Sequence, residues 1–101
     1  MIYETYKNRE HEVEAALFED VEDIGEIVMN LYYVGCNNIS VVNTPNNPQL
    51  EDTSYTTSIA FTQNGVVQVL FFGDILSFDE DDNAVVWNEE DFLNEFELIG
   101  E

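Results

Sequence analysis

The chain has almost no basic residues. Lys7 and Arg9 are its only Lys and Arg, against 22 Asp and Glu, so the formal net charge of the 101 residues is −20. Phosphates and anionic lipid headgroups are repelled by such a surface, which disfavours direct binding of nucleic acid and of anionic membranes. Because a small domain needs a net charge of only about 2–8 in magnitude to stay dispersed, the excess predicts that negative charge itself has a function.

Cysteine and long apolar runs are also scarce. Cys36 is the only cysteine, so an intramolecular disulfide is impossible and a reducing cytoplasm fits best. The N-terminal residues MIYETYKNREH lack the apolar core of a signal peptide, and no apolar run approaches the length of a membrane span. The composition, with 45% hydrophobic residues, predicts one globular domain over residues 1–101.

The residues that catalysis would need are missing. His11 is the only histidine, and there is no glycine-rich phosphate loop and no His/Cys cluster. Among 22 acids no spacing isolates a carboxylate pair for acid–base chemistry. The sequence therefore predicts a protein that is not an enzyme and that uses no cofactor and no metal.

A helical period runs through residues 11–34. Its apolar positions share one sector at 100° per residue: Val13, Ala16, Leu17, Val21, Ile24, Ile27, Val28 and Leu31. The opposite side is acidic: Glu12, Glu19, Glu22, Asp23 and Glu26. The pattern predicts one long amphipathic helix that stops at Gly35 and carries an acidic stripe roughly 20 Å long.

The rest of the chain is typical of strands. After a short strand at 39–43 and a loop at 44–54, Asn64-Gly65 between β-rich runs predicts a type I′ hairpin. Residues 75–78 and 84–87 suit a second hairpin, and Asn88 is placed to cap a short C-terminal helix. The predicted fold is therefore α+β, with the long helix packed on three or four antiparallel strands and a short helix at the end.

The acidic segment 79–90 resembles an EF-hand calcium loop. Asp79, Asp81, Asn83 and Glu90 fall at ligand positions 1, 3, 5 and 12. Position 6, where the sharp turn needs Gly, is Ala84, and the preceding residues favour a strand over the entering helix. A solvated acidic turn fits the local signals better, and a single EF-hand-like protein remains an alternative.

Two acidic clusters remain as candidate contact residues for a protein partner. The first is the helical stripe, and the second lies in the last third of the chain: Asp79, Glu80, Asp81, Asp82, Glu89, Glu90 and Asp91. Carboxylates in an extended array carry charge as DNA does, about one negative charge per 1.7 Å of duplex axis. A folded chain with such an array can occupy a basic DNA-binding groove and exclude DNA.

In size, acidity and scarcity of basic residues the chain resembles the DNA-mimic inhibitors of phages and other mobile elements, which include anti-CRISPR proteins, anti-restriction proteins and inhibitors of uracil-DNA glycosylase. The resemblance is one of class and rests on no shared motif. It implies a monomer or homodimer that acts in the cytoplasm of a host bacterial cell on a basic DNA- or RNA-binding protein such as a CRISPR nuclease. An acidic docking or regulatory module, which leaves its basic partner active, is the alternative from another class.

Overall fold

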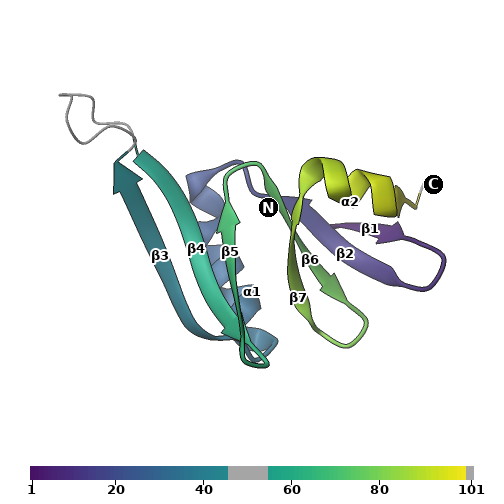
Figure 1. Ribbon diagram of the computed structural model, residues 1–101, viewed down its shortest axis with the longest axis horizontal. Helices are drawn as coiled ribbons and strands as arrows, with labels where there is room; N and C mark the ends of the chain where they lie inside the picture. The colour runs from purple at the N-terminus through teal and green to yellow at the C-terminus, as the bar shows by residue number, and fades with distance from the viewer. Residues whose placement is uncertain (46–54, 100–101) are drawn as a thin grey trace.

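The computed structural model describes residues 1–45 and 55–99, and these form eight strands, two α-helices and one 3-10 helix (Figure 1). The strands are β1 (Glu4–Lys7), β2 (Glu12–Leu17), β3 (Asn37–Pro45), β4 (Tyr55–Gln63), β5 (Val66–Phe71), β6 (Asp74–Asp79), β7 (Ala84–Asn88) and β8 (Glu97–Leu98). The helices are η1 (Val21–Asp23), α1 (Ile24–Tyr33) and α2 (Glu89–Glu95). None of these helices has the length and apolar character needed to cross a membrane.

The predicted α+β fold with one long helix on a single sheet is wrong. The described residues form two antiparallel sheets, sheet A with the order β7-β6-β2-β1-β8 and sheet B with the order β3-β4-β5. Figure 1 shows sheet B at one end of the molecule and sheet A at the other, with α2 lying over sheet A. The protein is therefore mostly β, with two short α-helices.

The error arose in residues 11–23. Glu12, Val13, Glu14 and Ala15 alternate between exposed and buried, which is the period of a strand. Strand β2 is the central strand of sheet A, paired on one side with β1 and on the other with β6. β6 is distant from β2 in the sequence, so this pairing is non-local. It outweighs the helical spacing of the apolar residues. The helix proper begins only at Ile24.

Several local predictions are confirmed. Gly35 has a φ of 88° and ends α1 in a Schellman arrangement, with Gly35 N–H donating to Tyr32 C=O and Cys36 N–H to Leu31 C=O. Asn64 and Gly65 have φ values of 53° and 78°, as a type I′ hairpin turn requires. The β4–β5 register pairs Thr62 with Val67 on either side of this turn.

Two further predictions about the second half of the chain hold, and one lies outside the described residues. β6 and β7 form the second hairpin, with Ile75 opposite Trp87 and Phe78 opposite Ala84. The Asn88 side chain accepts a hydrogen bond from Glu90 N–H and caps α2. Strand β3 extends to Pro45, and residues 46–54 of the predicted loop are outside the described part of the chain.

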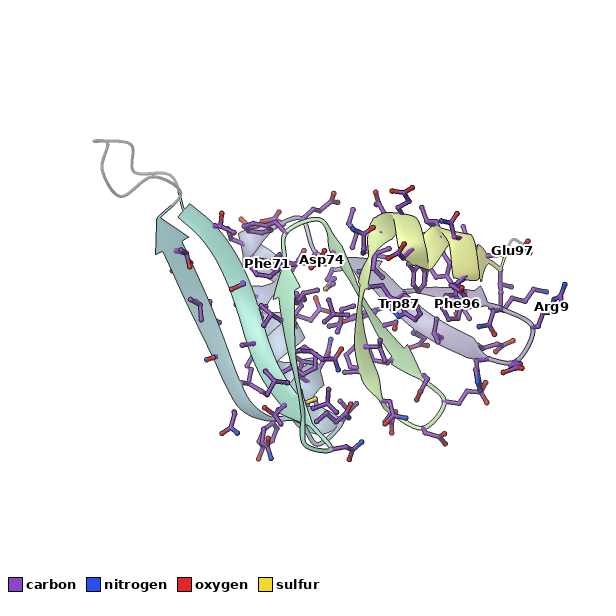
Figure 2. All side chains as sticks on the ribbon, viewed as in Figure 1. Arg9, Phe71, Asp74, Trp87, Phe96 and Glu97 are labelled. Atoms are coloured by element: carbon purple, nitrogen blue, oxygen red, sulfur yellow. The ribbon has the colours of Figure 1, made fainter. Side chains whose placement is uncertain are left out.

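Two apolar clusters hold the layers together. The larger cluster joins α1 to the inner face of sheet B and to β6 and β7, through Phe18, Ile27, Leu31, Cys36, Ile59, Phe61, Leu70, Leu76 and Ala84. The smaller lies between α2 and sheet A, through Val13, Ala15, Ile75, Phe92 and Phe96. Trp87 packs against it, with its ring centroid 5.5 Å from that of Phe96 (Figure 2). Because Leu76 and Ala84 of sheet A belong to the larger cluster, the two sheets share one core.

Two glutamine side chains join the sheets at their seam. Gln68 of β5 donates from Nε2 to the Ala84 carbonyl at 2.8 Å and accepts from Val86 N–H at 2.9 Å. Gln63 of β4 accepts from Ala84 N–H at 2.8 Å and donates to the Asp82 carbonyl at 3.0 Å. These amides satisfy backbone groups along the outer edge of β7, as a neighbouring strand would.

The connection between the sheets is tight. β5 runs into β6 through Phe72 and Gly73, which has a φ of 90°. The carboxylate of Asp74 accepts a hydrogen bond from Phe71 N–H at 3.0 Å across this turn (Figure 2). A second tie comes from Phe18, whose N–H donates to the Asp74 carbonyl at 2.9 Å. The end of β2 is thereby fixed to the point where one sheet becomes the other.

Candidate functional site: an acidic band beside sheet A

Charge is distributed unequally between the two sheets. The three strands of sheet B contain no charged residue. Of the 19 acidic residues that the structure describes, 16 are exposed, and only Asp23, Asp74 and Asp79 are half-buried. The described acids therefore lie on sheet A, the helices and their connections, where they form a strongly negative surface.

Two glutamates of strand β2 lie on the face of sheet A that is opposite to α2. Val13 and Ala15 are buried in the cluster beneath α2. Because successive residues of a strand point to opposite faces, Glu12 and Glu14 lie on the other face of sheet A. The N–H of Glu12 donates to Glu80 Oε1 at 3.1 Å, which links this face to the β6–β7 turn.

A cleft of about 300 Å³ opens beside Glu14. Three carboxylates line it: Glu14 of β2, Glu26 of α1 and Asp82 of the β6–β7 turn. The Tyr3 hydroxyl, which accepts a hydrogen bond from Asn30 Nδ2 at 2.9 Å, also lines this cleft. Burial raises the pKa of Tyr3, the hydrogen bond from Asn30 opposes this in part, and the carboxylates of Glu26, Asp23 and Glu14 raise the pKa further. The cleft therefore offers three carboxylates and a neutral hydroxyl to a cationic group.

A second acidic cleft adjoins the first. It has a volume of about 590 Å³ and is lined by four carboxylates, those of Glu4, Glu19, Asp20 and Asp23. The amino group of Met1 contacts Asp23 at 2.9 Å and Glu26 at 3.0 Å, so it lies between the two clefts. Hydrogen bonds to these two carboxylates raise the pKa of the amino group.

We call the carboxylates of these two clefts the acidic band: Glu4, Glu14, Glu19, Asp20, Asp23, Glu26 and Asp82. It contains the predicted residues Glu19, Asp23, Glu26 and Asp82, with Glu12 and Glu80 beside it. The prediction missed Glu4, Glu14 and Asp20. The alternation of Glu12, Val13, Glu14 and Ala15 was the signal that could have identified Glu14.

The remaining predicted acids lie elsewhere. The predicted helical stripe does not exist, because Glu12 is on β2, Glu19 follows that strand, and Glu22 and Asp23 are in η1. Glu89, Glu90 and Asp91 form the first turn of α2, on the face of sheet A opposite to Glu12 and Glu14. The second predicted cluster is thereby divided, because β7 separates its two parts (Figure 1).

The β6–β7 turn is held by one carboxylate. Asp79 Oδ1 accepts from the N–H groups of Asp81 and Asn83 at 2.9 Å, and its Oδ2 accepts from Asn83 Nδ2 at 3.1 Å. Burial alone would raise the pKa of Asp79, but these hydrogen bonds outweigh it and lower the pKa below its ordinary value. The carboxylate thus stabilises the turn as an anion.

The same geometry does not form an EF-hand loop. Ala84 begins β7, and Glu90 lies in α2 beyond the other end of that strand. A five-residue strand spans roughly 16 Å, so Glu90 is far from Asp79 and Asp81. Among the described residues no group of three or more His, Cys, Asp or Glu is placed to hold a metal ion.

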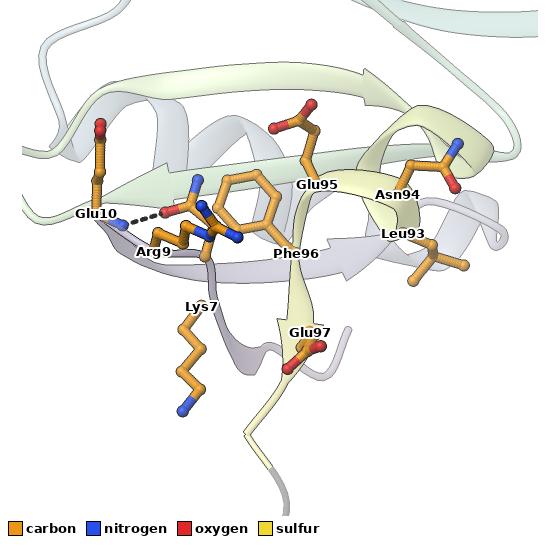
Figure 3. A pocket seen from close by; sticks show the side chains of 9 residues that line it. Lys7, Arg9, Glu10, Leu93, Asn94, Glu95, Phe96 and Glu97 are labelled. Atoms are coloured by element: carbon orange, nitrogen blue, oxygen red, sulfur yellow. Dashed lines mark hydrogen bonds between the residues drawn. The ribbon is translucent and has the colours of Figure 1, made fainter.

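Both basic side chains lie at another place on sheet A. A cleft of about 760 Å³ between the β1–β2 turn and the end of α2 contains Lys7 and Arg9 together with Glu10, Glu95 and Glu97 (Figure 3). Lys7 also stands opposite Glu12 and Glu97 in the sheet register. Positive and negative charges mix here, so the acidic band is the more negative of the two surfaces.

An apolar groove borders the acidic band. It has a volume of about 600 Å³ and runs between α1 and the start of β3, lined by Val28, Met29, Tyr32, Tyr33, Cys36, Asn37, Asn38 and Ile39. Tyr33 lines both this groove and the cleft that contains Glu14. Tyr32 and Tyr33 are 73% and 74% exposed, which leaves their rings free to contact a partner. Burial raises the pKa of the Cys36 thiol, so it lines the groove as a neutral group.

Comparisons of the chain with protein-family models, with curated proteins and with solved structures found no match. Its function is therefore inferred from its own residues.

Proposed function

We propose that this chain is an inhibitor encoded by a phage or another mobile element, and that it binds the basic nucleic-acid groove of a host enzyme by presenting the charge of DNA. The observation that carries the proposal is the acidic band, where seven carboxylates from four parts of the chain line two adjoining clefts. Solubility alone does not require so many carboxylates to be gathered in one place. A basic groove would be attracted to it at long range and would gain contacts with several carboxylates at once.

The target is a protein with a groove rich in Arg and Lys. An anti-CRISPR protein acting on a CRISPR nuclease is the specific form of the proposal, and restriction enzymes and uracil-DNA glycosylases have grooves of the same charge. The site of action is the cytoplasm of the bacterial host. The apolar groove beside Tyr33 supplies contacts that salt does not screen, so binding should depend less on salt than DNA binding does.

A competition titration tests the proposal. A guide-loaded CRISPR nuclease, a restriction enzyme and a uracil-DNA glycosylase are each mixed with labelled DNA, and this chain is added at increasing concentration. We expect displacement of DNA from at least one of them, with an association rate that falls steeply as salt rises from about 50 to about 500 mM. Undiminished binding of DNA to every enzyme that also binds this chain would favour the acidic docking module instead.

Two double variants with the same change in charge locate the contact. Glu14→Lys with Asp82→Lys reverses two carboxylates of the acidic band, and Glu89→Lys with Glu90→Lys reverses two on α2. All four residues are exposed. We expect the first pair to weaken displacement about tenfold or more and the second to have a much smaller effect. Equal losses would show that net charge alone matters, and would contradict a role for the band.

A further inference from the structure

The edges of the two sheets are protected to very different degrees. An exposed edge strand offers unpaired N–H and C=O groups to any other strand, and folded proteins normally shield it. The outer edge of β7 is bonded to Gln63 and Gln68. β5 lies along this seam because Gln68 is one of its residues. The edge strand β8 has only two residues, and one of them, Glu97, is charged.

Strand β3 has none of these protections in the described part of the chain. It is nine residues long, carries no charge, and pairs there only with β4. After an irregularity between Asn37 and Ser40, its register is regular from Ser40 to Pro45. Val41 and Val42 are 44% and 42% exposed. β3 is thus an uncharged edge with two exposed valines and a regular register from Ser40 onward, the kind that pairs with another strand.

The net charge of the molecule restricts which strand can pair with β3. Two copies of a chain with a net charge of −20 repel each other. The repulsion between exposed charges is screened beyond about 8 Å at physiological salt, so contact is possible where acids are distant. Sheet B is such a place, since its strands have no acid to oppose an acid of the second copy. A basic partner would instead be attracted to the acidic band and would gain no charge contact at β3.

We propose that β3 pairs antiparallel with β3 of a second copy, so that two three-stranded sheets become one sheet of six strands. A two-fold axis satisfies this contact because the same residues face each other from both copies. Alternate N–H and C=O groups of Ser40–Thr44, which point away from β4, bond to their equivalents in the partner. The two copies of sheet A, with their acidic strands, then lie at the two far ends of the dimer, because sheet A is at the other end of each molecule (Figure 1).

The test compares two substitutions on opposite edges of sheet B. Val42→Lys places a positive charge on β3, where the two copies meet near the axis, and Val67→Lys places the same charge on β5. Both residues are exposed and both pair with β4 positions whose side chains share the outer face of the sheet, Ser58 and Thr62. Each variant changes the net charge equally, so a difference between them reflects position.

Molecular mass is measured by sedimentation equilibrium from about 5 to about 500 µM, a range that covers the affinities expected of a small interface. We expect the wild type to approach twice its mass of 11.6 kDa, Val67→Lys to behave similarly, and Val42→Lys to weaken dimerisation about tenfold or more. Amide exchange should show protection of backbone N–H groups within Ser40–Thr44 that increases with concentration. A monomer at every concentration, or a dimer without new protection in β3, would overturn the proposal.

Discussion

Four of the five strands in sheet A carry an acidic residue, whereas the three strands of sheet B carry none. Sheet B buries apolar side chains on one face, through Ile59 and Phe61, whereas sheet A buries them on both, Val13 and Ala15 beneath α2 and Leu76 and Ala84 in the larger cluster. The exposed positions differ as well, since sheet A presents Glu12 and Glu14 and sheet B presents Ser40, Val42 and Val69. The comparison teaches that the described charge belongs to exposed positions of sheet A, the helices and their connections, while Asp74 and Asp79 also hold turns.

The two sheets also differ in how they can associate. The acidic band repels a second copy and attracts a cationic groove. The neutral edge at β3 is indifferent to charge and depends on hydrogen bonds and apolar contacts. One end of the molecule is therefore suited to a foreign basic partner, and the other to a copy of itself.

The largest expected effect tests whether the two sheets are one folding unit. Phe61 of β4 and Phe92 of α2 are 1% and 0% exposed, and each belongs to a different apolar cluster. Replacing either by Ala should lower the free energy of unfolding by about 3–5 kcal/mol, through lost burial and the cavity left behind. We expect one cooperative transition in both variants, because Leu76 and Ala84 of sheet A lie in the cluster that contains Phe61.

Urea denaturation measures this, with Trp87 fluorescence reporting on sheet A and amide exchange of β4 reporting on sheet B. Leu93→Ala is the control, since Leu93 is the neighbour of Phe92 but is 56% exposed; it should cost no more than about 0.5 kcal/mol. If Phe92→Ala unfolds sheet A while β4 stays protected, the sheets are independent units.

A smaller effect is expected at the seam between the sheets. Gln68→Ala removes the partners of the Ala84 carbonyl and of Val86 N–H. Leaving these two backbone groups unpaired should cost about 1–3 kcal/mol. Gln68→Glu should also destabilise, because it places an acceptor against the Ala84 carbonyl, whereas Val67→Ala, at an exposed neighbour, should not.

Amide exchange at Val86 is the specific measurement. It should accelerate in Gln68→Ala, change less in Gln68→Glu, whose carboxylate still accepts from Val86 N–H, and stay unchanged in Val67→Ala. An unchanged Val86 in Gln68→Ala would mean that the seam is held by packing alone, and that the two sheets depend on their shared core more than on this bridge.

The local features of the fold were predictable from sequence, because short-range chemistry determines them. Asn64-Gly65 supplies the two positive φ values of a hairpin turn, Gly35 ends a helix, and Asn88 caps one. Residues 11–23 were not predicted correctly, since their apolar residues fit a helical period while Glu12 to Ala15 also fit a strand. Only the pairing of β2 with β6, some 60 residues away in sequence, decides between the two.

The candidate site was predictable in its residue type and not in its geometry. The excess of acid is plain from composition, but the prediction placed Glu19, Asp23 and Glu26 on a helical stripe and Asp82 in a separate cluster, whereas the structure places all four along the two clefts. The pairing of β1 with β2 brings Glu4 and Glu14 into the two clefts from opposite faces of sheet A, Glu4 beside Ala15 on the face that α2 covers and Glu14 on the other face. Tertiary pairing therefore decides which carboxylates form the band.

The smallest expected effect concerns Asp79, an acid with a structural role. Asp79 is an acid of sheet A, and its carboxylate also holds the β6–β7 turn through Asp81 and Asn83. Asp79→Ala should lower the free energy of unfolding at pH 7 by about 1 kcal/mol, the low end for bonds to a charged group, since this half-buried carboxylate is partly screened by solvent.

The folded pKa of Asp79 is lower than its unfolded value of 3.8. The stabilisation is therefore fully present above that value and is lost as the pH falls through the folded pKa. Urea denaturation of both proteins between about pH 7 and pH 2 measures the difference, which should be constant down to about pH 5 and then decrease. Asp79→Asn, which keeps an oxygen acceptor without the charge, should show a smaller loss at pH 7, and that loss should also decrease in acid because the wild-type carboxylate is protonated there. A gap between wild type and Asp79→Ala that widens in acid would mean that the carboxylate is destabilising, and that Asp79 belongs with the exposed acids of sheet A after all.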